Sequence, residues 1–207
     1  MVSSSMRELK KALRLSRQIA SRMDGNQVQS DLHALKIRSY IILSHAAIEE
    51  YLESLSREIA LKSISLLKDE NFVSYSLLAL ISHYKSKFPQ TFVVPASSHI
   101  LRSTLADLSD QAIMKHEKAI DDNHGIRAKS VNNLFYPIGV DADRGYPGLV
   151  PALDTFGLKR GRYAHGLGAT IVETRNNVDT EVRGIRTMLL EVDKIALECC
   201  RSEVEFL

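Results

Sequence analysis

A helical pattern of apolar residues runs from about residue 30 to residue 67, and its length constrains the fold more than any other feature. Apolar or small side chains recur at three- and four-residue steps, the spacing of one face of an α-helix. Helices longer than about 25 residues usually have packing partners along most of their length. We therefore expect one long helix against which the other segments pack. The predicted stripe comprises Leu32, Leu35, Ser39, Ile42, Ala46, Glu49 or Glu50, Leu52, Leu55 and Ile59.

The same periodicity continues through most of the remaining chain. Further helices are predicted over residues 6–23, 71–88, 97–118, 129–135, 149–165 and 177–204. Connections are predicted at residues 90–96, 121–125 and 141–147. With no convincing strand pair and no internal repeat, the expected fold is all-α, an up-and-down bundle of six to seven helices without significant sheet. We expect a single domain over 1–207, with an N-terminal helical arm (1–29) and a core (30–207).

Composition limits the compartment and the partners. The chain has 207 residues, 44% of them hydrophobic, which suits a globular core that needs no disulfide or metal. Its net charge of +2 neither indicates nor excludes RNA binding. The two cysteines, Cys199 and Cys200, are adjacent, so a bridge between them would be strained, and two thiols without a disulfide framework indicate a reducing compartment. With no apolar leader and no run of about 18 apolar residues, we expect a cytoplasmic protein without membrane contact.

Most familiar catalytic signatures are missing from the sequence. There is no glycine-rich phosphate loop, no His-Glu-x-x-His, no spaced Cys/His set and no Gly-x-Ser-x-Gly. What remains is the basic segment 154–166, in which Lys159, Arg160 and Arg162 precede His165 at a predicted helix end. The helix dipole favours a protonated histidine there and the arginines oppose it. This balance suits a group that exchanges protons near neutral pH.

Arg160 and His165 lie on different sides of one predicted helix. At about 100° per residue, roughly 140° separates them around the helix axis, whereas Arg162 is only about 60° from His165. A compact site that uses both Arg160 and His165 therefore benefits from a second copy of the helix. The pattern favours a two-fold homodimer in which two arginines and two histidines surround one phosphate.

Three segments resemble the HEPN superfamily of ribonucleases. Arg160 and His165 fit its Arg-x4-6-His motif, within the ending Arg-Gly-Arg-Tyr-Ala-His-Gly. Residues 39–53 resemble its first core helix, which carries an Ile-Glu-x-Tyr pattern, and residues 130–139 are similar to a segment of the RNase-L-associated branch. The matches occur in the expected order. The chain departs from the pattern at Gly161, where many active members carry Asn, Asp or His.

The resemblance implies a metal-independent endoribonuclease without a cofactor, used in toxin–antitoxin or phage-defence systems. Arg160 would neutralise charge on the transition state, and His165 would take a proton from the RNA 2′-hydroxyl or deliver one to the 5′-oxygen, leaving 2′,3′-cyclic phosphate ends. The implied partners are a second copy, RNA and an antitoxin or regulatory protein. The supporting or RNA-binding residues are expected to be Lys159, Arg162, Tyr163, Glu49, Glu50, Asn132 and Asn133.

Two other functions stay open at this point: a non-catalytic HEPN scaffold that binds a nucleotide, RNA or protein, and a helical protein-interaction module. The residues have plainer interpretations too. His165 could simply cap its helix, and the arginines could pair with Asp154 or Glu173. Either of Glu49 and Glu50 could be a structural ion-pair partner or be exposed.

Four further polar residues also have structural interpretations. Asn132 and Asn133 suit a helix terminus. His45, beside the apolar stripe, is more typical of a core or interface histidine than of a catalyst. His116 and His124 flank a predicted loop without partners at metal-ligand spacing.

Overall fold

The computed structural model describes residues 2–84, 98–165 and 173–202, leaving out the side chains of residues 98–102 and 165. Within these ranges the chain forms eight α-helices, one 3-10 helix and no strand, which confirms the all-α prediction. None of these helices has the length and apolarity needed to cross a bilayer. The elements are α1 (Ser4–Ile19), α2 (Asp31–Glu70), α3 (Tyr75–His83), α4 (Ser98–Asp121), α5 (Ala128–Phe135), η1 (Tyr136–Ile138), α6 (Ala142–Gly145), α7 (Leu149–His165) and α8 (Arg175–Arg201).

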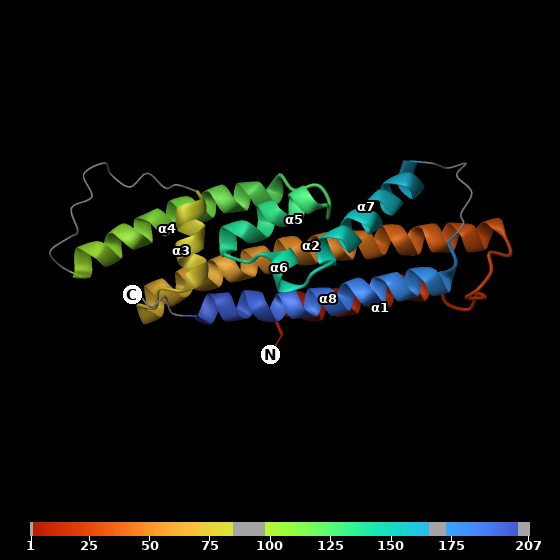
Figure 1. Cartoon of the computed structure of the whole chain (residues 1–207), viewed down its shortest axis with the longest axis horizontal. Coiled ribbons are helices and arrows are strands. Elements are labelled where there is room, and N and C mark those ends of the chain that lie inside the picture. Colours follow the sequence, from red (N-terminus) through yellow and green to blue (C-terminus); the bar gives the residue numbers. More distant parts are fainter. Residues whose placement is uncertain (1, 85–97, 166–172, 203–207) are drawn as a thin grey trace.

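Helix α2 is the axis of the molecule (Figure 1). It has 40 residues, begins after Ser30, whose side chain accepts a hydrogen bond from the His33 amide, and ends at Asn71 in a left-handed conformation. Figure 1 shows α1 and α8 along one side of α2 and α4, α5 and α7 along the other, in agreement with the contacts between these elements. The prediction of one long helix with partners along its length is therefore confirmed.

The predicted buried face of α2 is wrong in the first half of the helix. Leu32 and Leu35 are 59% and 55% exposed, whereas Ile37, Tyr40 and Ile41 are buried. Apolar residues occur on several sides of this half, so periodicity alone admits more than one stripe. In the second half, the predicted Leu52, Leu55 and Ile59 are fully buried, as expected.

A short helix, α6, occupies part of the predicted loop at 141–147. The Asp141 carboxylate accepts a hydrogen bond from the Arg144 amide and so caps its single turn. Ala142 is buried against the core, which holds the turn in place. Single turns are too short to leave a periodic pattern, and this one raises the helix number above the predicted six to seven.

Two buried aspartates of α8 join three helices. Asp179 accepts a hydrogen bond from the Tyr40 hydroxyl of α2 at 2.8 Å and pairs with Nε of Arg17 in α1 at 3.0 Å. About four turns further along α8, Asp193 accepts hydrogen bonds from the Ser3 amide at 2.9 Å and from the Ser3 hydroxyl. The Tyr51 hydroxyl of α2 donates to the same carboxylate at 3.3 Å. These charge-assisted bonds offset the cost of burying the two carboxylates and attach α1 to the core.

Replacing Asp193 by alanine is expected to lower the free energy of unfolding by about 3 kcal/mol, because the Tyr51 hydroxyl and the Ser3 groups lose a charged acceptor. Urea unfolding followed by circular dichroism measures the change. Asp122, which is exposed, provides the matched control: Asp122→Ala is expected to cost less than about 0.5 kcal/mol. Equal effects of the two substitutions would contradict a structural role for Asp193.

The buried His116 makes the free energy of unfolding depend on pH. It is fully buried, with Nε2 at 2.8 Å from the Ser56 hydroxyl and Nδ1 at 2.9 Å from the Tyr84 hydroxyl. Burial, followed by the charges of His83 and Arg57, lowers the pKa of His116 to about 4. The unfolded chain, in which its pKa is about 6.5, therefore binds the proton first as the pH falls.

The free energy of unfolding should consequently be highest above pH 6.5 and decline as the pH falls from about 6.5 to about 4. Chemical unfolding at a series of pH values measures this slope. His116→Gln should reduce the slope, and because burial lowers the pKa of His45 to about 4 as well, the double substitution with His45→Gln should reduce it further. A wild-type profile that is level over this interval would show that His116 is protonated as readily in the folded as in the unfolded chain.

Candidate functional site

A cavity of about 340 Å³ lies between α2, α7 and the loop that joins α4 to α5. This volume falls near the lower end of the range of about 300 to 1,000 Å³ that is usual for small-ligand sites. The cavity is lined by His45, Glu49, His124, Gly125, Ile126, Arg127, Gly157 and Arg160. A second cavity, of about 350 Å³ between α1 and α2, has neither a histidine nor an arginine in its lining, so we place the chemistry at the first.

Arg160 reaches the first cavity because it continues the buried face of α7. Leu153 and Phe156 on that face are fully buried, and Arg160 follows at the same helical spacing, partly buried. Among the described residues, no carboxylate lies within 4 Å of its guanidinium. Its charge is nevertheless felt in the cavity: after burial, it contributes to the lowered pKa of His45, and it opposes part of the rise in the pKa of Glu49.

His45 is buried in the wall that α2 provides. Its ring stacks on Phe156 with 6.4 Å between the ring centroids, and Nδ1 lies 3.6 Å from Oε2 of Glu49. Burial, followed by the charge of Arg160, lowers the pKa of His45 to about 4. The imidazole is therefore neutral at pH 7, with one nitrogen that donates and one that accepts hydrogen bonds.

Glu49 is one helical turn beyond His45 and is 25% exposed. Burial and the neighbouring Glu53 raise the pKa of Glu49, while a hydrogen bond from the Gly125 amide lowers it. The loop that supplies this amide is held by Asn123, whose side chain donates to Glu53 at 2.7 Å and to the Gly125 carbonyl at 3.1 Å. Gly125 has φ +126°, which favours glycine and lets the loop approach α2.

Arg127 and Gly157 form the opposite side of the cavity. Nε of Arg127 donates to Asp154 at 3.3 Å, and the same carboxylate accepts from the Ala128 amide at 3.0 Å, which fixes the start of α5. A Cβ atom at Gly157 would lie 3.3 Å from Cγ of Arg127 and 3.9 Å from Nε2 of His45. The absence of a side chain at Gly157 therefore keeps this part of the cavity open.

The structure separates the two adjacent glutamates that the sequence left as alternatives. Glu49 lines the cavity together with Arg160. Glu50 is exposed and lines the second cavity, on the side of α2 that faces α1. His45, for which a core or interface position was expected, is buried but also lines the first cavity.

The other basic-segment residues do not converge on the cavity. Lys159 binds Glu173 at 3.0 Å and Glu181 at 2.5 Å, so its ammonium group attaches α7 to the start of α8. Tyr163 is only 2% exposed and belongs to the core, in a position where RNA does not reach it. Arg162 is exposed on the outer side of α7.

The other predicted residues are Asn132 and Asn133 in α5 and His165 at the end of α7. Asn132 and Asn133 lie in α5, where the Asn132 carbonyl accepts a hydrogen bond from the Tyr136 amide, and neither lines the cavity. His165 is the last residue of α7, and its side chain lies outside the described part of the structure. The suggested pairing of the arginines with Asp154 or Glu173 is not found, since these carboxylates bind Arg127 and Lys159.

Six lining residues were not among the predicted site residues: His45, His124, Gly125, Ile126, Arg127 and Gly157. The glycine of the α4–α5 loop and a glycine on the inner side of α7 are the sequence signals that could have indicated them. Among the described side chains, no three His, Cys, Asp or Glu residues are grouped as metal ligands.

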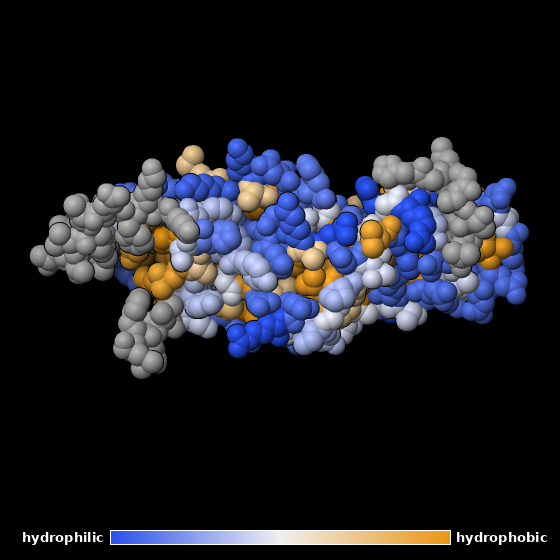
Figure 2. All heavy atoms as spheres, turned by 45° about the horizontal axis from the view of Figure 1, so that its top comes forward, coloured by the Kyte–Doolittle hydropathy of each residue, from blue (hydrophilic) through white to orange (hydrophobic). Residues whose placement is uncertain are grey.

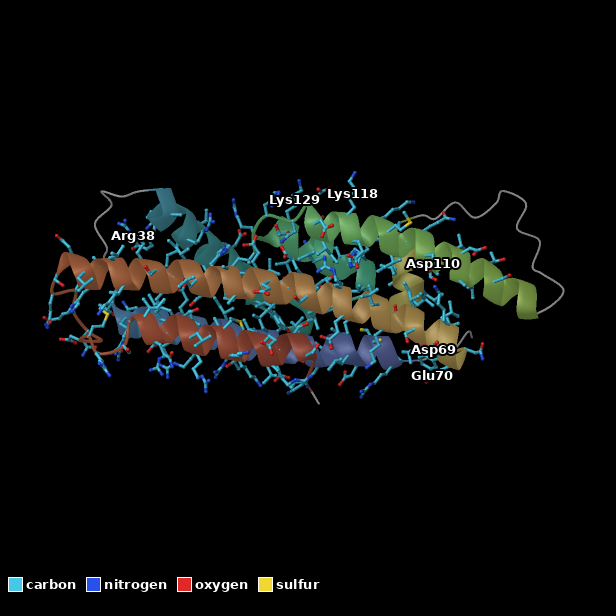
Figure 3. All side chains as sticks on the ribbon, turned by 180° about the vertical axis from the view of Figure 1, so that it is seen from behind. Arg38, Asp69, Glu70, Asp110, Lys118 and Lys129 are labelled. Atoms are coloured by element: carbon cyan, nitrogen blue, oxygen red, sulfur yellow. The ribbon has the colours of Figure 1, made fainter. Side chains whose placement is uncertain are left out.

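Figure 3 shows charged side chains at both ends of the molecule. Asp69, Glu70 and Asp110 lie toward the end formed by α3 and α4, whereas Arg38 lies at the other end, near α7. Arg38 precedes His45 by seven residues and so occupies the same side of α2.

The comparisons with known proteins agree with this architecture. The family model described as RiboL-PSP-HEPN matches residues 3–197. No curated protein and no solved structure matches the chain. The family match indicates a HEPN nuclease-like or nucleotide-binding role. Because the match spans nearly the whole chain and includes Arg160 and the cavity beside it, this protein belongs to the RiboL-PSP-HEPN family of the HEPN superfamily.

Proposed function

We propose that this protein is a metal-independent endoribonuclease that acts as a homodimer. The observation that carries the proposal is the state of Arg160: its guanidinium lines a cavity and, among the described residues, has no carboxylate within 4 Å. A partly buried arginine usually pairs with an acidic group, and a phosphate can take that place. The adjacent Lys159 is bound by two glutamates, so Arg160 differs from its neighbour in being available to a ligand.

The proposed reaction is transfer within the RNA chain. The ribose 2′-oxygen attacks the adjacent phosphorus and loses its proton to His165. The bond from phosphorus to the 5′-oxygen breaks as that oxygen receives a proton, and the products carry 2′,3′-cyclic phosphate and 5′-hydroxyl ends. Arg160 stabilises the extra negative charge of the transition state through its N–H donors. In a dimer, the second copy supplies the imidazole that protonates the leaving oxygen.

A second copy is expected against the outer side of α7. Leu158 is 55% exposed there, and His165 follows seven residues later in the same register. Figure 2 shows apolar surface over α7 that is bordered by hydrophilic side chains. Covering an exposed leucine of this kind favours association. Facing α7 helices would bring the His165 side of each chain toward the partner, whereas Arg160, about 160° from Leu158 around α7, would contact the RNA from the cavity side.

The biological role that we propose is that of a toxin or phage-defence effector, with an antitoxin or regulatory protein as its natural partner. An enzyme that cuts RNA without a metal needs such control in the cell. Growth arrest on expression, relieved by Arg160→Ala, would support this role.

Purified protein is expected to cleave single-stranded RNA in the presence of EDTA. His165→Ala should reduce the rate by about 10²- to 10⁴-fold, because acid–base catalysis is lost. Arg160→Ala should reduce it by about 10²- to 10³-fold, because transition-state charge is no longer neutralised. Gel analysis of end-labelled RNA, with end-group determination, measures both the rate and the cyclic phosphate.

Arg14→Ala is the matched control for Arg160→Ala, since Arg14 is exposed on α1. It should retain the wild-type rate. Cleavage that persists in the His165→Ala variant would exclude the proposed chemistry. RNA binding without any cleavage by the wild-type protein would instead identify a non-catalytic scaffold.

Leu158→Asp is expected to shift the protein from dimer to monomer and to reduce RNA cleavage in parallel, because a charge replaces an apolar contact. Size-exclusion chromatography with light scattering measures the mass. Leu61→Asp, at a leucine that is 49% exposed on α2, is the control and should remain dimeric. A wild-type protein that is monomeric at the concentrations at which it cleaves RNA would rule out the dimeric site.

A further inference from the structure

We infer that the cavity between α2, α7 and the α4–α5 loop binds one unstacked guanine base of the RNA, next to the phosphate that Arg160 contacts. This inference rests on the proposed function for its choice of RNA as the ligand. The cavity is of small-ligand size and combines a carboxylate with two arginines and two histidines. Proteins that recognise single-stranded RNA commonly bind an extruded base through its hydrogen-bonding edges and by stacking.

The Glu49 carboxylate makes the cavity unfavourable for a phosphate group alone. Its carboxylate lines the cavity on the same wall as His45 and would repel a phosphate group placed there. It accepts one hydrogen bond from the Gly125 amide, and a carboxylate has about four acceptor positions. Glu49 therefore retains capacity to accept hydrogen bonds from a ligand that carries donors.

Among the four RNA bases, guanine fits this combination of groups best. Its N1–H and 2-amino groups are neighbouring donors, which match the two oxygens of one carboxylate. Its O6 and N7 atoms are neighbouring acceptors, which suit an arginine. Adenine, cytosine and uracil offer no pair of adjacent donors on one edge. Arg127, whose Nε is held by Asp154, keeps its terminal nitrogens for such a contact.

Planar groups and open space suit a flat ligand. The guanidinium planes of Arg127 and Arg160 are surfaces on which a base can stack, and the neutral His45 ring, which packs on Phe156, lines the same cavity. Gly157 leaves the space between Arg127 and His45 unfilled, since a Cβ atom there would already contact Arg127. A glycine in the middle of a helix is destabilising relative to alanine, so its position at the cavity wall is consistent with a need for space.

The test compares nucleoside monophosphates that share the ribose phosphate and differ in the base. Isothermal titration of the full chain, in EDTA, with guanosine and inosine 5′-monophosphates measures the contribution of the 2-amino group. We expect guanosine monophosphate to bind about tenfold more tightly than inosine monophosphate, and more tightly than the adenosine, cytidine and uridine monophosphates. Glu49→Gln should remove most of the preference over inosine.

Glu50→Gln is the matched control, because Glu50 lies outside the cavity on the α1 side of the same helix. It should leave the preference unchanged. A second pair of variants tests the space itself: Gly157→Ala should weaken guanosine monophosphate binding, and Gly184→Ala, in α8 where a Cβ meets no atom within 4 Å, should not. Thermal unfolding of each variant establishes that it is folded.

Two results would overturn the inference. One is equal binding of all five nucleotides, and the other is inorganic phosphate that binds as tightly as guanosine monophosphate. Neither result bears on RNA cleavage, which depends on His165 and is measured separately. A guanine preference that depends on Glu49 in a protein that does not cleave RNA would uphold the base pocket and contradict the proposed nuclease.

Discussion

The ion pairs of Lys159 with Glu173 and Glu181 are the interactions on which the position of Arg160 depends. They fix one side of α7 to the start of α8. The next residue lies about 100° further around the helix, which directs it toward α2 and the α4–α5 loop. Two adjacent cations thus have different roles. Lys159 is neutralised and holds the helix, whereas Arg160 faces a cavity in which Glu49 is the acidic lining residue and forms no ion pair with it.

Much of the fold could be predicted from the sequence because it depends on local periodicity. The long helix α2 and the boundaries of α5 and α7 follow from spacing and caps. Faces of helices are harder to assign, since they depend on which neighbours pack where. Leu32 and Leu35 fit a helical stripe as well as Ile37 and Ile41 do, yet only the second pair is buried.

The candidate site was predicted only in part for the same reason. Arg160 and His165 are found by their spacing, and Arg160 lies at the cavity. Glu49 and Glu50 are neighbours on a helix with apolar residues on both sides, so choosing between them requires knowing that α7 packs beside Glu49. Tyr163 and Lys159 are close to the motif along the chain, but the helix turns one into the core and the other toward α8.

Gly161 connects the chemistry of the site with its stability. No atom lies within 4 Å of a Cβ built at this position, so packing within the chain does not require glycine there. Glycine in a helix interior costs roughly 1 kcal/mol relative to alanine. This glycine directly follows Arg160, so no side chain covers the surface of α7 at this position. The backbone exposed at Gly161 permits close approach by RNA or by a second α7. Gly161 is also the position at which the chain departs from the family pattern, so this departure lies on the surface that RNA and a second α7 would both contact.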